Sequence, residues 1–196
     1  MPSSKDRQRI EVPSHLYEQL AQIAETEDRT ITSVLNQLLF QALQSYQPTW
    51  IPSKHLSRFN GHAQHVLALA REEARSFQHN YMGSKHLLLC LLREQEGLAA
   101  LALEKLGVAL EPVRAAVEEI IGRGDHPVQE EIDYVPRARK VLSLALDEAE
   151  RQGSGYVRTE HILLGLVRDG GGVGADILDR LGVLGKVRAQ VFALLG

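Results

Sequence analysis

The strongest constraint on the fold is an internal repeat in which residues correspond at an offset of 75 positions. The segment YMGSKHLLLCLLREQEG, from Tyr81, aligns with YVRTEHILLGLVRDGGG, from Tyr156. Matches continue outside these segments: Ala63 and Ala138, Leu67 and Leu142, Glu73 and Glu148, Ala74 and Ala149, and the LGV triplets at 106–108 and 181–183. A register kept over this length indicates duplication of one structural unit.

Each unit is predicted to form four helices, because its apolar residues recur at helical spacing and neither unit alternates as a strand would. The expected helices of the first unit begin around Ala63 and then span 84–93, 98–106 and 110–121. Those of the second unit span 136–152, 159–168, 173–181 and 186–195. Ser84 and Thr159 are hydroxyl residues placed to cap the second helix of each unit. The polar stretch from Gly122 is expected to connect the two bundles.

The composition narrows the class of protein. The 196 residues include 22 Lys and Arg against 25 Asp and Glu, giving a net charge of −3, and 44% are hydrophobic. This balance excludes general disorder and gives no bulk attraction for nucleic acid. The single cysteine, Cys90, cannot form an intramolecular disulfide, and no apolar run reaches the roughly 20 residues of a membrane span. We therefore expect a reduced, cytoplasmic protein.

Residues 59–196 resemble the double Clp N-terminal domain, the substrate- and adaptor-binding module of ClpC-type AAA+ unfoldases. The resemblance is carried by RTEHILLGLVRDGGGVGADILDRLGV in the second unit, GSKHLLLCLLREQEGLAALALEKLGV in the first, IIGRG, and YVPRARKVLSLALDEA. It implies two four-helix repeats with pseudo-twofold symmetry, at 59–121 and 136–196, joined by a connector at 122–135.

The motor of such an unfoldase is not expected. The sequence lacks the phosphate-binding motif GxxxxGK[ST] and ends at Gly196, where the resembled proteins continue into their ATPase modules. We therefore expect a recognition protein without a motor, which is not an enzyme and has no catalytic residue and no cofactor.

The histidines and the cysteine form no strong chemical pattern. His62 and His65 lie one helical turn apart, but no carboxylate completes a set of ligands in the sequence, so no metal is expected. His86 and His161 occupy equivalent positions, where packing and capping are the favoured roles. Cys90 aligns with Gly165, which indicates a small side chain at a helix contact rather than a nucleophile.

Some ClpC-type N-domains recognise phosphorylated arginine through a GTEH motif in each repeat, where a glutamate suits the guanidinium and amides at a helix start suit the phosphate. The matching positions are Thr159, Glu160 and His161 in the second unit and Ser84 and Lys85 in the first. Arg158 replaces the glycine of the motif, and Lys85 would repel a guanidinium. The competing interpretation is that Glu160 only favours a helix N-terminus.

The resemblance implies a second binding surface at the start of the first helix of each repeat. In the family these positions contact adaptors and, in actinobacterial members, bind cyclic peptide antibiotics. The matching residues form a hydrophobic peptide or adaptor surface: Leu56, Phe59, Tyr134, Arg139 and Leu142. The alternative is that Phe59 and Tyr134 are core residues of their bundles.

Residues 1–46 lie outside this resemblance and are predicted to form a strand followed by two helices. Residues 7–12 alternate, with Ile10 and Val12 on one face. Pro13 ends the strand, and Ser14 caps a helix that carries Leu16, Leu20, Ile23 and Ala24 on one face. A second helix begins at Thr30 or Thr32 and presents Val34, Leu35, Leu38, Leu39, Ala42 and Leu43.

This order resembles the ribbon-helix-helix repressors and antitoxins, in which two chains pair their strands and insert the ribbon into the DNA major groove. The resemblance implies a homodimer through residues 8–45. The DNA-binding positions are Arg7, Arg9 and Glu11 on the ribbon and Thr30, Thr32 and Ser33 at the start of the second helix. The alternative is a segment that only dimerises, which the nearby acidic residues favour.

The whole chain is thus predicted to be mainly α-helical, with a ribbon-helix-helix head at 1–46, a linker at 47–58 and two Clp-type repeats. The leading hypothesis is a transcriptional regulator that binds operator DNA through the head and a marked protein, a peptide or a cyclic peptide antibiotic through the repeats. The alternative is an adaptor or decoy of the Clp protease system, in contact with its unfoldase, in which the head only dimerises two recognition domains.

Overall fold

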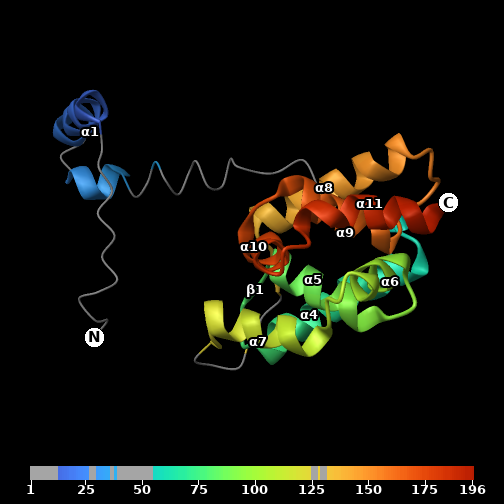
Figure 1. Ribbon diagram of the computed structural model, residues 1–196. Coiled ribbons are helices and arrows are strands. Elements are labelled where there is room, and N and C mark those ends of the chain that lie inside the picture. The colour runs from blue at the N-terminus through green and yellow to red at the C-terminus, as the bar shows by residue number, and fades with distance from the viewer. Residues whose placement is uncertain (1–12, 27–29, 36–37, 39–54, 125–127, 129–131) are drawn as a thin grey trace. The chain divides into compact units, whose positions relative to one another are not determined.

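The computed structural model describes residues 13–26, 30–35, 38, 55–124, 128 and 132–196 (Figure 1). The chain divides into two compact units, residues 1–47 and 48–196, and each is described by itself. The described part is mainly helical, as predicted. Within it, no helix combines the length and the apolar character needed to cross a membrane.

The first unit contains a small packed pair of helical segments. Helix α1 (Ser14–Thr26) starts directly after Pro13, and residues 31–35 are helical after Thr30. The hydroxyl of Thr30 accepts the backbone N–H of Ser33 at 3.2 Å, so Thr30 caps the second segment. Leu20 and Ala24 pack with Val34 in a small core, to which Ile31 and Leu35 add partly buried surface.

Two predictions for this unit are not confirmed, one because it lies outside the described residues and one because the buried face is smaller. The strand expected at residues 7–12 lies outside the described residues. Of the four apolar residues expected on one face of α1, Leu20 and Ala24 are buried, whereas Leu16 and Ile23 are exposed. The contact with the second segment is therefore narrower than the apolar pattern predicts.

The second unit contains all eight helices predicted for the repeats. A short 3-10 helix, η1 (Leu56–Arg58), leads into the first repeat. The first repeat consists of α4 (Gly61–Ser76), α5 (Ser84–Glu94), α6 (Leu98–Lys105) and α7 (Leu110–Ile121). The second repeat consists of α8 (Pro136–Arg151), α9 (Thr159–Asp169), α10 (Gly172–Arg180) and α11 (Leu184–Leu195). The bounds differ from the predicted ones by at most two residues wherever both ends were predicted.

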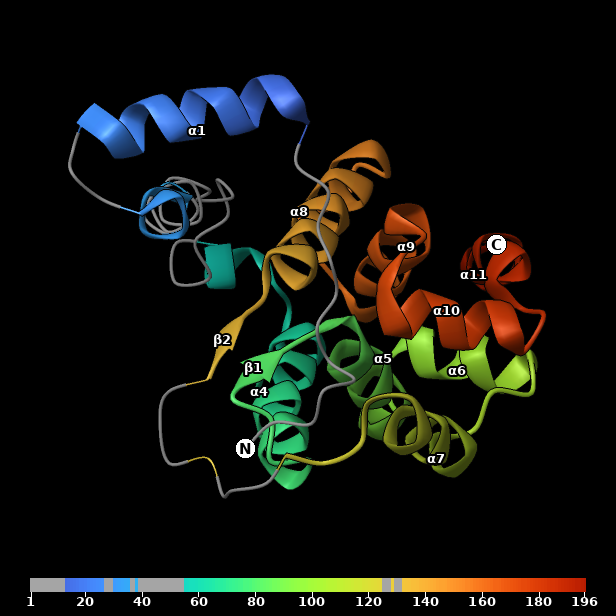
Figure 2. The same ribbon diagram turned by 90° about the vertical axis from the view of Figure 1, so that its left-hand side faces the viewer.

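The two repeats exchange their third helices. Helix α6 of the first repeat packs against α9 and α11 of the second, and α10 of the second packs against α5 and α7 of the first. Figures 1 and 2 show α6 beside α11 and α10 beside α5. One continuous hydrophobic core therefore runs through both repeats, where the sequence suggested a bundle for each.

Short parallel strands connect the repeats in the same crossed manner. Strand β1 (Tyr81–Met82) pairs with β2 (Asp133–Tyr134), which precedes α8 (Figure 2). An isolated bridge joins Phe59 to Val157, and the 75-residue offset relates this bridge to the pair of Met82 with Tyr134. These pairings escape a sequence reading, because two residues are too few for an alternating pattern.

The two hydroxyl residues predicted as caps act on other helices than expected. Gly83 and Arg158 occupy the cap positions of α5 and α9, so Ser84 and Thr159 are the first helical residues. The hydroxyl of Thr159 accepts the N–H of Ala99, in the first turn of α6, at 3.3 Å. The hydroxyl of Ser84 accepts the N–H of Gly174, in α10, also at 3.3 Å. Each repeat thus caps the third helix of the other repeat.

Candidate functional site

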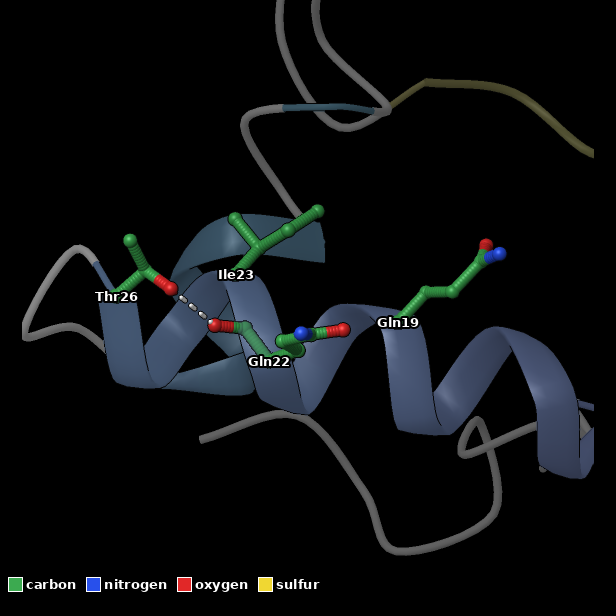
Figure 3. A pocket seen from close by; sticks show the side chains of 4 residues that line it. All are labelled: Gln19, Gln22, Ile23 and Thr26. Carbon is green, nitrogen blue, oxygen red and sulfur yellow. Dashed lines mark hydrogen bonds between the residues drawn. The ribbon is translucent and has the colours of Figure 1, made fainter.

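One surface hollow lies on the first unit and offers little chemistry. It has a volume of about 450 Å³ and is lined by Gln19, Gln22, Ile23 and Thr26 of α1 (Figure 3). The hydroxyl of Thr26 donates to the backbone carbonyl of Gln22 at 2.8 Å. None of these four described side chains carries a titratable group.

The second hollow, of about 380 Å³, lies where both repeats meet, and we take it as the candidate site. Its walls come from the start of α4, the turn into α6 and the start of α9. The lining residues are Asn60, His62, Glu96, Gly97, Leu98, Tyr156, Arg158, Thr159 and Glu160. The crossed packing of α6 on α9 brings these segments together, although they are about 100 residues apart in the sequence at the extremes.

Glu160 is the acidic group placed deepest in this hollow. Its side chain is buried, and burial raises the pKa of its carboxyl above the ordinary value, while its own backbone N–H and the nearby Arg158 act in the opposite direction. A buried carboxylate gains most from a ligand that carries positive charge and hydrogen-bond donors. The chemistry of this carboxyl group thus suits a guanidinium or ammonium group.

His161 and its equivalent His86 belong to the framework of the site. The Nδ1 atom of His161 accepts the N–H of Arg158 at 2.9 Å, and that of His86 accepts the N–H of Gly83 at 3.0 Å. Burial lowers the pKa of His86 to about 3, helped by Lys85 and His79, and that of His161 to about 4, helped by Arg158. Both rings are buried and neutral near pH 7, which agrees with the packing and capping roles expected from the sequence.

The equivalent position in the first repeat carries the opposite charge. Lys85 is buried, and its ammonium lies 3.0 Å from the hydroxyl of Tyr81 and 4.3 Å from the centre of the Tyr81 ring. The side chain of Ser84 faces α10 through its bond to Gly174. The first repeat therefore has an ammonium group at the position where the second repeat has the carboxylate of Glu160.

Most of the residues matched to the hydrophobic adaptor surface are buried. Phe59, Tyr134 and Leu142 belong to the core, and burial raises the pKa of the Tyr134 hydroxyl to about 12. Leu56 is partly buried against the core, and Arg139 pairs with Asp133. In this structure only Leu56 and Arg139 retain accessible side-chain surface.

The residues matched to DNA binding fall in two groups. Arg7, Arg9 and Glu11 lie outside the described residues. Thr30 caps the helical segment 31–35, in which Thr32 is exposed and Ser33 is half-buried.

Two buried carboxylates join helices in a way that the sequence reading missed. Glu73 pairs with Arg93 and Arg114, and Glu148 pairs with Arg168 and Arg188, all from other helices. The identity of Glu73 and Glu148 in the two repeats was a signal that could have revealed them.

No carboxylate partner for His62 was evident from the sequence, but the structure provides one. The carboxylate of Glu94 lies 2.6 Å from the Nδ1 atom of His62. The histidine therefore has the carboxylate partner that the sequence did not reveal. The thiol of Cys90 is buried, and burial raises its pKa, so it is no activated nucleophile.

Comparison with known proteins identifies the repeats. The model of the Clp repeat (R) N-terminal domain matches residues 58–181. The negative regulator of genetic competence ClpC/MecB of Bacillus subtilis is 54% identical over 140 residues, which cover 71% of this chain and 17% of that protein. The ClpA homologue of Guillardia theta, an ATP-binding subunit of the ATP-dependent Clp protease, is 49% identical over 140 residues, which cover 71% of this chain and 17% of that protein. The chain thus spans about a sixth of the length of these relatives.

Solved structures share the fold at lower sequence identity. The N-terminal domain of ClpD from Arabidopsis thaliana has a TM-score of 0.59 at 24% identity, covering 71% of this chain and 95% of that one. The Hsp104 N-terminal domain from Candida albicans has a TM-score of 0.59 at 23% identity, covering 70% and 91%. The resemblance inferred from the two repeats is therefore confirmed, and the chain belongs to the Clp repeat N-terminal domain family.

Proposed function

We propose that the double repeat is a non-catalytic recognition module that binds peptides or adaptor proteins in the hollow around Glu160. The observation that carries this proposal is a buried carboxylate that lines an open hollow between two repeats. A solved complex of the ClpV N-domain with a VipB peptide, 17% identical with a TM-score of 0.57, supports peptide binding on this fold. No group in the hollow is arranged as a nucleophile with a base, so binding is the chemistry that it offers.

The ligand proposed for this site is a phosphorylated arginine of a marked protein. Glu160 would accept the guanidinium nitrogens, because a carboxylate and a guanidinium form two parallel charge-assisted hydrogen bonds. Arg158, at the rim of the same hollow, would neutralise the phosphate. The exposed ring of Tyr156 offers a flat surface for the aliphatic part of the side chain.

Isothermal titration of the full chain with free phosphoarginine tests this proposal. Glu160→Gln keeps the shape and removes the charge, so affinity should fall about tenfold or more, since charged hydrogen bonds contribute about 1.5–3 kcal/mol. Lys85→Gln is the matched control, because it changes the equivalent residue of the other repeat and should leave affinity unchanged. Equal affinity of the wild type and Glu160→Gln would contradict the proposal.

We further propose that residues 1–46 form a dimeric ribbon-helix-helix head that binds operator DNA, so that the chain acts as a regulator. The Thr30 cap and the helix pair built on Leu20, Ala24 and Val34 support this architecture. A unit of about 46 residues is small for a domain that is stable alone. The exposed Leu16, Tyr17 and Ile23 supply apolar surface for a second chain.

Two measurements separate this regulator from the adaptor or decoy alternative. Analytical ultracentrifugation should give a dimer that Leu16→Glu converts to a monomer. Selection of DNA sites in vitro should then yield a defined sequence whose affinity falls strongly in Arg7→Ala/Arg9→Ala. A dimer that selects no DNA sequence but binds a Clp unfoldase would favour the adaptor or decoy alternative.

A further inference from the structure

The first repeat places histidine and carboxylate ligands around one point beside the hollow. The side chain of Glu94 is 1% exposed; its Oε1 atom lies 2.6 Å from Nδ1 of His62, and its Oε2 atom accepts the N–H of Gly97 at 2.7 Å. Oε2 of Glu96 lies 3.8 Å from the same Nδ1 atom. One ligand atom from each of His62, Glu94 and Glu96 lies within 4.8 Å of the others.

The second repeat surrounds the equivalent carboxylate with different side chains. Asp169, the equivalent of Glu94, is 0% exposed, and its carboxylate pairs with Arg137 at 2.9 Å and with Lys140 at 2.7 Å. Arg and Lys carry permanent charges near neutral pH, so this buried carboxylate is neutralised by two cations.

The first repeat has replaced both cations by imidazoles. The 75-residue offset aligns His62 with Arg137 and His65 with Lys140, and it aligns Glu96 with Gly171. Among the described residues, the side-chain ion pair of Glu94 is with His62 alone. Compared with the second repeat, the first repeat therefore lacks two permanent positive charges around a buried carboxylate and has a second carboxylate nearby.

We propose that His62, Glu94 and Glu96 bind a divalent metal ion of the zinc type, with His65 as a fourth ligand from the same helix. A buried carboxylate without a counter-charge is costly, and a divalent ion supplies the two charges that Arg137 and Lys140 supply in the second repeat. Imidazole nitrogen and carboxylate oxygen bind zinc at about 2.0–2.2 Å, whereas magnesium and calcium prefer oxygen ligands alone.

Three of the four ligands already converge, and His65 is the one that has to turn toward them from the same helix. His62 and His65 lie three residues apart on α4 and therefore face the same side of that helix. In the second repeat the residue equivalent to His65, Lys140, reaches the carboxylate of Asp169 from the same helix position. A metal here would fix the start of α4 to the turn into α6, which are two walls of the candidate site.

The test is zinc titration of the full chain, purified without a histidine tag and freed of metal by a chelator. The wild type should bind one zinc ion per chain at the site. The double variant His62→Arg/His65→Lys copies the cations of the second repeat, so it should weaken zinc binding about 100-fold or more while the metal-free protein keeps its melting temperature.

Two single variants make the result specific. Glu96→Gln changes a side chain that is 79% exposed and should weaken zinc binding about tenfold without affecting the fold. His55→Ala removes a histidine outside the cluster and should leave binding unchanged. Zinc affinity that is the same in the wild type and in His62→Arg/His65→Lys, or no saturable binding by the wild type, would overturn the proposal.

Discussion

The two repeats share a framework of buried polar groups but differ in the charge of equivalent side chains. In both, a buried glutamate, Glu73 or Glu148, receives two arginines, and a buried histidine, His86 or His161, accepts a backbone N–H at the start of its helix. These groups hold helices together, so a change in one would leave its buried partners without hydrogen bonds.

The differences lie at charged positions near the start of the first and second helices of each repeat. Lys85 stands where the second repeat has Glu160, and His62 stands where it has Arg137. The duplication has therefore kept the scaffold and changed the charge of each binding position. We infer that the two repeats offer different ligand chemistries on one fold, and the following experiments test how far their likeness extends.

The largest effect is expected where the repeats differ in helix spacing. A side-chain carbon added at Gly165 of α9 would lie 2.4 Å from the carbonyl oxygen of Val141 and 2.9 Å from the backbone nitrogen of Ala145, both in α8. The equivalent Cys90 is fully buried between α5 and its neighbours without such a conflict. Gly165→Ala should therefore lower the free energy of unfolding by about 3 kcal/mol, measured by urea denaturation.

Cys90→Ala is the matched variant for this comparison, and it should cost about 1 kcal/mol because it only removes a sulfur atom. If Gly165→Ala and Cys90→Ala destabilise the protein equally, α8 and α9 do not approach each other more closely than α4 and α5.

The two repeats are expected to contribute in the same way to the pH dependence of the free energy of unfolding. His86 and His161 have folded-state pKa values of about 3 and about 4, below the ordinary value of 6.5. As the pH falls below 6.5, the unfolded chain binds protons that the folded chain does not bind. Each histidine should therefore reduce stability by about 1.4 kcal/mol per pH unit until the pH nears its folded-state pKa.

The measurement is the free energy of unfolding at pH 7 and pH 5.5 for the wild type, His86→Asn and His161→Asn. Asparagine retains an acceptor for the backbone N–H but does not titrate, so each variant should lose about 1 kcal/mol of the pH dependence. A wild-type slope in both variants would mean that these rings are protonated in the folded protein.

The crossed hydrogen bonds between the repeats should contribute smaller, equal amounts. Thr159→Val and Ser84→Ala each remove the acceptor for an N–H of the other repeat's third helix, at Ala99 or Gly174. Each should cost about 1 kcal/mol, and the double variant should show the sum because the two bonds are independent. Thermal unfolding of the variants measures both losses. If only one substitution lowers stability, only one of the two crossed hydrogen bonds contributes to it.

The smallest effect is expected at the exposed ion pair between Arg58 and Glu150, whose nitrogen and oxygen lie 2.8 Å apart. Both side chains are largely accessible, so solvent screens the attraction. Arg58→Ala should change the free energy of unfolding by less than about 0.5 kcal/mol in the same denaturation experiment. A loss above about 1 kcal/mol would mean that this pair helps to hold the two repeats together.

The helices could be predicted from the sequence because their signals are local. Apolar spacing and the internal repeat predicted α4 to α11 closely, and the alignment of Cys90 with Gly165 predicted a tight helix contact. The candidate site was predicted in part. Glu160 and Thr159 came from a motif, whereas Glu96 and Leu98 carried no signal, because they reach the hollow only through the crossing of α6.

The pairing of His62 with Glu94 could not be predicted either. The two residues are 32 positions apart, and spacing within one helix says nothing about which residue of another helix packs against it. The hydroxyls of Ser84 and Thr159 show this limit as well, since their positions suggested local caps and their partners belong to the other repeat.

The sequence by itself determined that this protein contains a duplicated four-helix unit, because periodicity and repetition are properties of the chain alone. Only the tertiary structure decided which helices complete each bundle, where the charged residues meet and which repeat presents which chemistry. The physical reason is that third helices such as α6 bury surface against both repeats, and only their placement in space brings Glu96 toward His62 and Leu98 toward Glu160.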